Sequence, residues 1–191
     1  MSELMAYARL GIGHILDAGA IDHLLFLLVL AAAYRLREWR DALWVVTAFT
    51  VGHSVSLALA ASGTLVLPSR TIEFLIPLTI VATGIENLAG VGTRPASGGP
   101  YRPVLAGVFG LVHGAGFAIY LRGLFLDAIT LPLLGFNIGI EIAQVLVLAT
   151  AAFALALVDR VASHRIRVVA ISTTVLVIAA RMAVERSPWP P

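Results

Sequence analysis

The stretch LPLLGFNIGIEIAQVLVLATAAFALALV, residues 131–158, decides the fold class of this chain. Glu141 is the only charged residue in it. A helix needs about 20 apolar residues to cross the ~30 Å hydrocarbon core of a bilayer. The stretch therefore predicts a membrane-spanning helix that is long enough to tilt.

Similar apolar runs fill most of the remaining chain. Polar or Gly- and Pro-rich segments separate them, and the runs are residues 11–34, 41–61, 71–89, 104–121 and 167–184. The sequence is 59% hydrophobic and 13% charged, whereas soluble domains are about 45–50% apolar and about 25% charged. We therefore predict an all-α fold, a polytopic membrane helix bundle of about six transmembrane helices. A single integral membrane domain would occupy residues 1–191.

Charge and cysteine content exclude several functions. Cysteine is absent, so disulfides and thiolate metal sites are impossible. The net charge of +2 does not indicate nucleic-acid binding, because the basic residues, all arginine, lie in the predicted loops. The first ten residues include Glu3 and lack a basic segment, so we expect no cleaved signal peptide.

The arginines also predict an orientation. Eight fall in one set of alternate loops: Arg35, Arg37, Arg40, Arg94, Arg102, Arg160, Arg165 and Arg167. Only five fall in the other set or near the termini. The richer set is expected to be cytoplasmic. We predict a multi-pass protein of the plasma (inner) membrane with both termini outside and the loop around Ser97 in the cytoplasm.

Ionisable residues within the apolar runs are the candidates for function. They are His14, Asp22, His23, His53, Glu73, Glu86, His113 and Glu141. A charged side chain at mid-membrane costs roughly 2.5–3.5 kcal/mol on insertion scales, so such groups pair or bind a cation. For Glu73 and Glu86 the interpretation as residues near the membrane interface is favoured over a functional role.

Depth along the predicted helices groups five of these residues. At a rise of about 1.5 Å per residue, they lie ~13–17 Å from the outer surface. The five are Asp22, His23, His53, His113 and Glu141. We predict a metal site formed by the three histidines and completed by Asp22 or Glu141. His14 is either a further ligand or a residue at the mouth of the site beside Asp17.

Polar and small neighbours extend the predicted site. Asn137 and Gln144 share a helical stripe with Glu141, and Thr50 and Ser54 flank His53. Glu86 and Asn87, near the cytoplasmic end of their helix, are candidates for an inner exit. Small residues repeat every four positions in two helices, at Ala106, Gly110, Gly114 and at Gly135, Gly139, Ala143. Such stripes allow close packing, which we expect to bring His113 near Glu141.

The ligand types restrict the metal. Imidazole with carboxylate suits Ni, Co, Zn or Fe better than Mg or Ca. Cu(I) prefers sulfur ligands, but cysteine is absent and the methionines, Met1, Met5 and Met182, lie near the chain ends.

Five motifs in order resemble the HupE/UreJ family of hydrogenase and urease accessory membrane proteins. They are GIGHILDAGAIDHLLFLL, AFTVGHSVSLALA, TIEFLIPLTIVATGIENL, FGLVHGAGFA and GFNIGIEIAQ. The resemblance implies a nickel or cobalt permease that serves metalloenzyme maturation proteins. It assigns the family's motif residues to His14, Asp22, His23, His53, His113, Asn137 and Glu141. The family usually places five residues between the first His and Asp-His, whereas seven lie between His14 and Asp22. On a regular helix the two extra residues rotate His14 by about 200° relative to Asp22.

Three functions remain open. The first is a secondary permease for nickel or cobalt, without direct ATP use because no phosphate-binding loop is present. The second is an intramembrane zinc hydrolase with Glu141 or Asp22 as general base. The third is a metal-binding accessory or sensor protein without flux. The expected partners are the metal ion, the lipid bilayer and maturation proteins of metalloenzymes, and no nucleic acid.

Overall fold

The structure, a computed structural model, describes residues 2–17, 19, 21–65, 68–92, 101–122 and 130–189. Helices account for nearly all of these residues, and no strand occurs among them. The elements are α1 (Glu3–Leu16), α2 (Ile21–Ala33), the short 3₁₀ helix η2 (Leu36–Glu38), α3 (Trp39–Ala61), α4 (Ser69–Gly90), α5 (Tyr101–Arg122), α6 (Thr130–Val158) and α7 (His164–Glu185). The predicted all-α fold is confirmed, while the loop around Ser97 lies outside the described residues.

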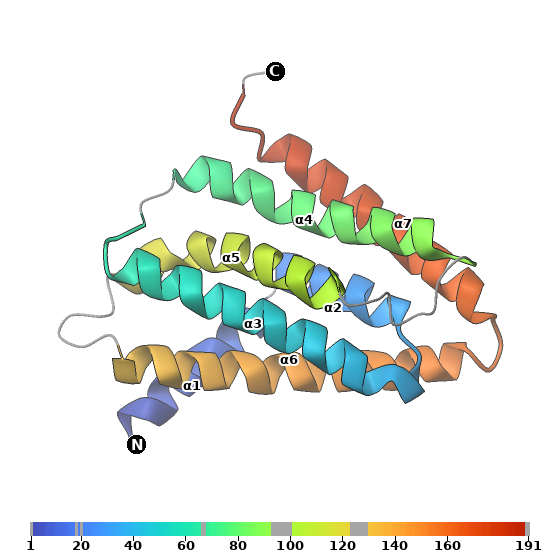
Figure 1. Ribbon diagram of the computed structural model, residues 1–191, viewed down its shortest axis with the longest axis horizontal. Helices are drawn as coiled ribbons and strands as arrows, with labels where there is room; N and C mark the ends of the chain where they lie inside the picture. The colour runs from blue at the N-terminus through green and yellow to red at the C-terminus, as the bar shows by residue number, and fades with distance from the viewer. Residues whose placement is uncertain are drawn as a thin grey trace.

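The helices from α2 to α7 lie along the long axis of the molecule in alternating directions (Figure 1). Helices α3, α5 and α7 run one way, and α2, α4 and α6 run the other. The glycines agree with this, since Gly110 lies against Phe49 and Gly114 against His53, so α3 and α5 are parallel. The chain therefore returns through α4 between these two helices, as a multi-pass membrane bundle requires.

The predicted continuous helix over residues 11–34 is wrong. Helix α1 ends at Leu16, α2 begins at Ile21, and the two axes differ by 72°. At the break, Asp17 has an extended backbone and its carboxylate accepts a hydrogen bond of 2.8 Å from the N–H of Gly19. Asp and Gly favour such side-chain-stabilised turns over helix. The predicted first span is therefore replaced by two short helices at a large angle.

Not all of the predicted spans are found among the described residues. Among the described residues, four helical segments are long and apolar enough to cross a membrane: Leu36–Ala60, Ser69–Gly90, Thr130–Val158 and His164–Glu185. The broken pair α1 and α2 would make a fifth. About six spans are not confirmed, and the assignment of α5 as a further span stays a prediction.

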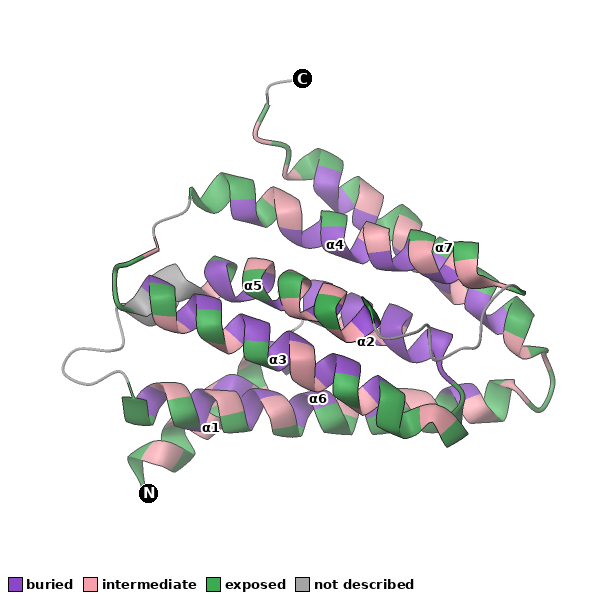
Figure 2. Cartoon of the chain, in the orientation of Figure 1, coloured by how far each residue is buried: buried purple, intermediate pink, exposed green. Residues whose placement is uncertain are grey.

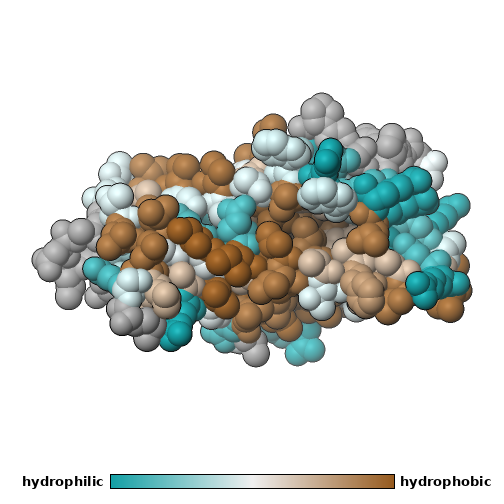
Figure 3. All heavy atoms as spheres, turned by 90° about the horizontal axis from the view of Figure 1, so that it is seen from below, coloured by the Kyte–Doolittle hydropathy of each residue, from teal (hydrophilic) through white to brown (hydrophobic). Residues whose placement is uncertain are grey.

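The distribution of side chains is that of a membrane protein. Large apolar residues face outward along the helices, among them Val51, Val108, Ile138, Phe153 and Val177. Polar residues such as Thr50, Thr83 and Gln144 are buried between helices. Figure 2 shows the buried faces turned toward the neighbouring helices. Figure 3 shows hydrophobic residues over the middle of one face and hydrophilic residues gathered at the end where α3 begins and α6 ends.

Glycine stripes bring two pairs of helices into contact, but not the predicted pair. A Cβ at Gly110 or Gly114 would collide with backbone oxygens of α3, and one at Gly139 would collide with the backbone of α1. The α5 stripe therefore packs on α3, and the α6 stripe packs on α1. The expected approach of His113 to Glu141 through these stripes is wrong, because each stripe has a different partner helix.

Candidate metal centre

Three histidines from three helices meet where the first span is broken. His14 lies in the last turn of α1, His23 in the first turn of α2, and His53 within α3. One ring nitrogen from each lies within 4.8 Å of the others. The ring centroids are 4.5 Å apart for His14 and His23, and 5.9 Å apart for His14 and His53. This spacing lets one ion contact all three rings after small side-chain adjustments.

Each histidine of this cluster has a buried ring nitrogen without a partner. Among the described residues, no hydrogen-bond partner is present for Nε2 of His14, for Nε2 of His23 or for either ring nitrogen of His53. Buried polar atoms in proteins normally have a partner, because leaving one unpaired costs about 1–3 kcal/mol. A transition-metal ion would satisfy several of these nitrogens together, and neutral imidazole is a common ligand of such ions. The donor set therefore fits a metal.

The break in the first span explains why His14 joins the cluster. The rotation of about 200° applies only to a regular helix. Here α1 ends at Leu16, Asp17 accepts a hydrogen bond from the N–H of Gly19, and the axes of α1 and α2 differ by 72°. His14 and His23 consequently face one another from the two sides of the turn. The extra residues in the motif therefore do not remove His14 from the site.

His113 lies beside the cluster and differs from its members because one of its ring nitrogens is hydrogen-bonded. Its ring centroid is 5.4 Å from that of His23, and its Nε2 is 2.9 Å from the hydroxyl of Thr79. That hydroxyl donates to the carbonyl of Ile76, so it accepts the N–H of His113. The other ring nitrogen, Nδ1, then carries the lone pair, and it has no partner among the described residues. A ring held in this way by its other nitrogen is typical of metal ligands.

Asp22 connects the cluster to the end of the chain. Its Oδ1 lies 3.2 Å from Nδ1 of His23 and accepts the backbone N–H of His23. Its Oδ2 accepts a hydrogen bond of 3.2 Å from Arg186, just beyond α7. The side chain is almost fully buried. Asp22 therefore adds a negative charge beside the histidines and orients one of them.

Glu141 is not brought into the three-histidine group. Its carboxylate accepts a hydrogen bond of 3.3 Å from Thr47, and Gln144 accepts one of 2.6 Å from Thr50. These two bonds join α6 to α3 alongside the cluster. Ser54 donates to the backbone of Thr50 and keeps its hydroxyl within α3. The ligand role predicted for Glu141 stays a prediction.

Two other predicted residues lie outside the three-histidine group. Asn137 is on α6, and its side-chain oxygen is buried without a partner among the described residues. Glu73 is exposed near the start of α4. Asn137 remains a candidate beside the cluster, whereas the exposure of Glu73 favours the interpretation as an interface residue.

A surface pocket leads to the cluster. It has a volume of about 710 Å³, and its lining includes Arg9, Gly13, His14, Asp17 and Phe117. Phe117 covers the ring of His14 at 3.9 Å between centroids. His14 is thus both a cluster member and part of the pocket wall, which combines the two alternatives predicted for it.

Two buried arginines at the opposite end of the bundle differ from the prediction. Arg102 was expected in a loop, but it is buried and bonded to Glu86 and Asn87. Arg167 was expected at the membrane interface, but it is buried and bonded to Asp159 and to the backbone of Tyr34. Partners contributed by other segments of the chain make this burial possible, and the sequence alone does not show which residues they are.

Comparison with known proteins identifies the family. Residues 1–186 match the family model described as HupE / UreJ protein. The chain belongs to the HupE/UreJ family. This family is associated with nickel or cobalt accessory or transport functions. No curated protein and no solved structure matches this HupE/UreJ chain.

Proposed function

We propose that this HupE/UreJ protein is a secondary permease for nickel or cobalt, with the metal as its cargo. The observation that carries the proposal is the group of buried, unpaired imidazole nitrogens of His14, His23 and His53. His113 would supply a fourth nitrogen through its free Nδ1. Neutral imidazoles in a low-dielectric interior favour a borderline transition metal over Mg²⁺ or Ca²⁺.

The broken span suits a cation in transit. The C-terminal end of a helix carries a partial negative charge, and α1 ends within one turn of His14. The N-terminal end of α2 is unfavourable to a cation, but Asp22 in its first turn supplies a full negative charge. Discontinuous helices with ligands near their ends are a recurring design of ion-binding sites in secondary transporters.

The surface pocket supports access from one side of the membrane. Asp17 is exposed in its wall, and His14 links this wall to the buried histidines. A divalent ion arriving from water would meet a carboxylate first and then exchange water for imidazole. The exchange is stepwise, which limits the desolvation cost at each stage. The distribution of arginines among the loops predicts that the side of the membrane on which this pocket opens is external.

Flux through the purified protein in liposomes tests the proposal. We expect uptake of Ni²⁺ or Co²⁺ above that of empty liposomes, and its loss in His23→Ala and His53→Ala. His164→Ala is the matched control, because His164 lies at the start of α7, outside the cluster. The proposal is rejected if the native protein moves neither ion. A zinc hydrolase would instead cleave a substrate without flux, and an accessory protein would bind metal only.

A further inference from the structure

Arg102, one of the two buried arginines described at the end of the bundle opposite the histidines, joins three helices there. Arg102, in the first turn of α5, donates to Glu86 at 2.7 Å and to Asn87 at 3.0 Å. Its guanidinium also lies over the ring of Tyr34, 5.5 Å from the centroid. Asn87 in turn donates to the backbone of Val29 at 2.7 Å. Arg102 therefore ties α5 to α4 and to the end of α2.

A row of polar side chains on α4 runs from the histidines to this arginine. Thr79 holds His113. Thr83 and Asn87 follow at successive intervals of four residues, so the three lie on one helical face, and all are buried. Glu86 lies next to Asn87 at the end of the row. These are the polar groups that an ion leaving His113 would meet on α4.

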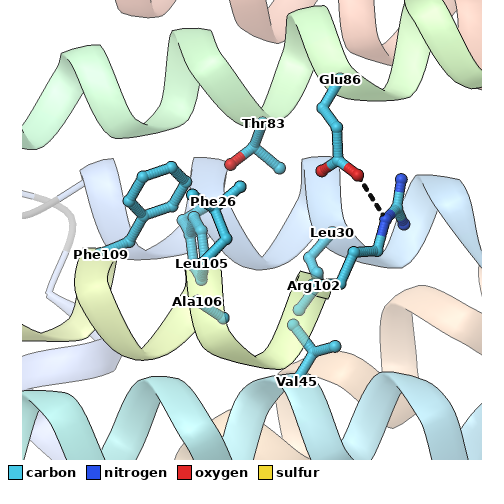
Figure 4. A pocket seen from close by; sticks show the side chains of 9 residues that line it. All are labelled: Phe26, Leu30, Val45, Thr83, Glu86, Arg102, Leu105, Ala106 and Phe109. Atoms are coloured by element: carbon cyan, nitrogen blue, oxygen red, sulfur yellow. Dashed lines mark hydrogen bonds and ion pairs between the residues drawn. The ribbon is translucent and has the colours of Figure 1, made fainter. Parts of the chain in front are cut away.

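A small cavity occupies the middle of this row. Its volume is about 20 Å³, and its lining includes Phe26, Thr83, Glu86, Arg102 and Phe109. Figure 4 shows Thr83 between the phenyl rings and the Glu86–Arg102 ion pair. A space of this size holds about one water molecule. It is therefore too small for a hydrated divalent ion as the structure stands.

An aromatic pair separates the cavity from the histidines. Phe26 stacks on Phe49 with centroids 4.6 Å apart. Both rings contact His113, at 5.7 Å and 5.0 Å. The cavity thus has an apolar wall toward the metal centre and an ion pair at its other end. Passage inward requires that both move.

We infer that Arg102 is the inner gate of the permeation route, a tethered cation that occupies Glu86 until a metal ion displaces it. This inference rests on the proposed permease function. Glu86 would then be neutralised by Arg102 in the closed state and by the passing ion in the open state. After its release from Glu86, the guanidinium of Arg102 would remain in contact with the Tyr34 ring, since the faces of aromatic rings attract cations.

Thiol labelling at Thr83 tests the gate without requiring transport. The chain has no cysteine, so Thr83→Cys places a single thiol in the cavity. We expect it to react slowly with a membrane-impermeant reagent added from the Arg102 side. In the Glu86→Gln/Arg102→Gln background, the rate should rise by about tenfold, because thiol reactivity follows access. The double change leaves no buried charge unpaired, which protects folding.

Controls separate the gate from the metal centre. Arg181→Gln removes an exposed arginine that pairs with Glu185, so it should leave labelling unchanged. Nickel binding should persist in the double variant, because the histidines are untouched. Equal labelling rates with and without Arg102 would overturn the gate. Absence of flux in the native protein would instead overturn the permease, whatever the labelling shows.

Discussion

At the scale of single residues, the candidate metal centre is recognised by buried ring nitrogens that have no hydrogen-bond partner among the described residues. His53 is buried with both ring nitrogens unpaired among the described residues, and Nε2 of His23 is buried without a partner, while Nδ1 of His23 lies 3.2 Å from Asp22. In a metal-free protein these atoms are destabilising, since a buried polar group without a partner costs about 1–3 kcal/mol. We expect a destabilising histidine of this kind to be present because its ring nitrogen binds a ligand.

His53→Phe should separate binding from stability. The aromatic replacement removes the unpaired nitrogens and fills most of the space beside Phe49, whose ring lies 6.2 Å from that of His53. We expect the metal-free variant to unfold at the same temperature as the native protein or at a higher one. Nickel should stabilise the native protein, by about 2.7 kcal/mol at a hundredfold excess over Kd, and should leave the variant unchanged. Thermal unfolding in detergent with and without nickel measures both.

The control is His164→Gln, at the start of α7 outside the cluster. It should keep the full nickel-induced stabilisation. A nickel-induced shift of native size in His53→Phe would contradict a ligand role for His53.

The sequence predicted which residues are candidates for the site, but it predicted only in part which of them contact one another. The free-energy cost of placing polar side chains within a membrane identified His23, His53 and His113 as candidates. These residues could be recognised because a polar residue within an apolar run is apparent from the sequence. The same reasoning missed Arg102, since the Gly- and Pro-rich segment beside it suggested a loop. Only the folded chain places Glu86 and Asn87 against it.

At the scale of elements, the break between α1 and α2 creates the centre. A continuous helix would carry His14 away from Asp22 and His23. The break itself had a signal in the sequence, because Asp17 and Gly19 are turn-forming residues. The apolar residues on both sides outweighed that signal, and a run of apolar residues cannot by itself distinguish one helix from two.

Asp17→Ala should weaken the metal centre by loosening the break. The variant loses the acceptor for the Gly19 N–H. A net hydrogen bond is worth about 0.5–1.5 kcal/mol, so we expect roughly fivefold weaker nickel binding. Equilibrium dialysis of the purified protein measures the change. Asp17→Asn is the matched control, because its side-chain oxygen accepts the same bond without the charge.

Native-like affinity in Asp17→Asn with reduced affinity in Asp17→Ala would support the turn. Native-like affinity in both variants would argue against a role for the turn. Equally weakened binding in both variants would indicate that the charge of Asp17 at the mouth of the pocket is what matters.

At the scale of the whole molecule, two polar centres lie at different depths of an apolar bundle. The histidine cluster lies near the surface pocket, and the Glu86–Arg102 pair lies toward the arginine-rich end. The stacked Phe26 and Phe49 lie between them. Hydropathy made the bundle predictable. The burial of Arg102 against Glu86 and Asn87 was not, because it depends on contacts between different helices.

X-ray absorption at the nickel edge of the nickel-loaded protein tests the central claim most directly. We predict imidazole nitrogens from His14, His23 and His53 in the ligand shell, and one imidazole fewer in His14→Ala. The His164→Gln spectrum should match that of the native protein. A ligand shell made of oxygen alone, or one that His14→Ala and His53→Ala leave unaltered, would contradict the account.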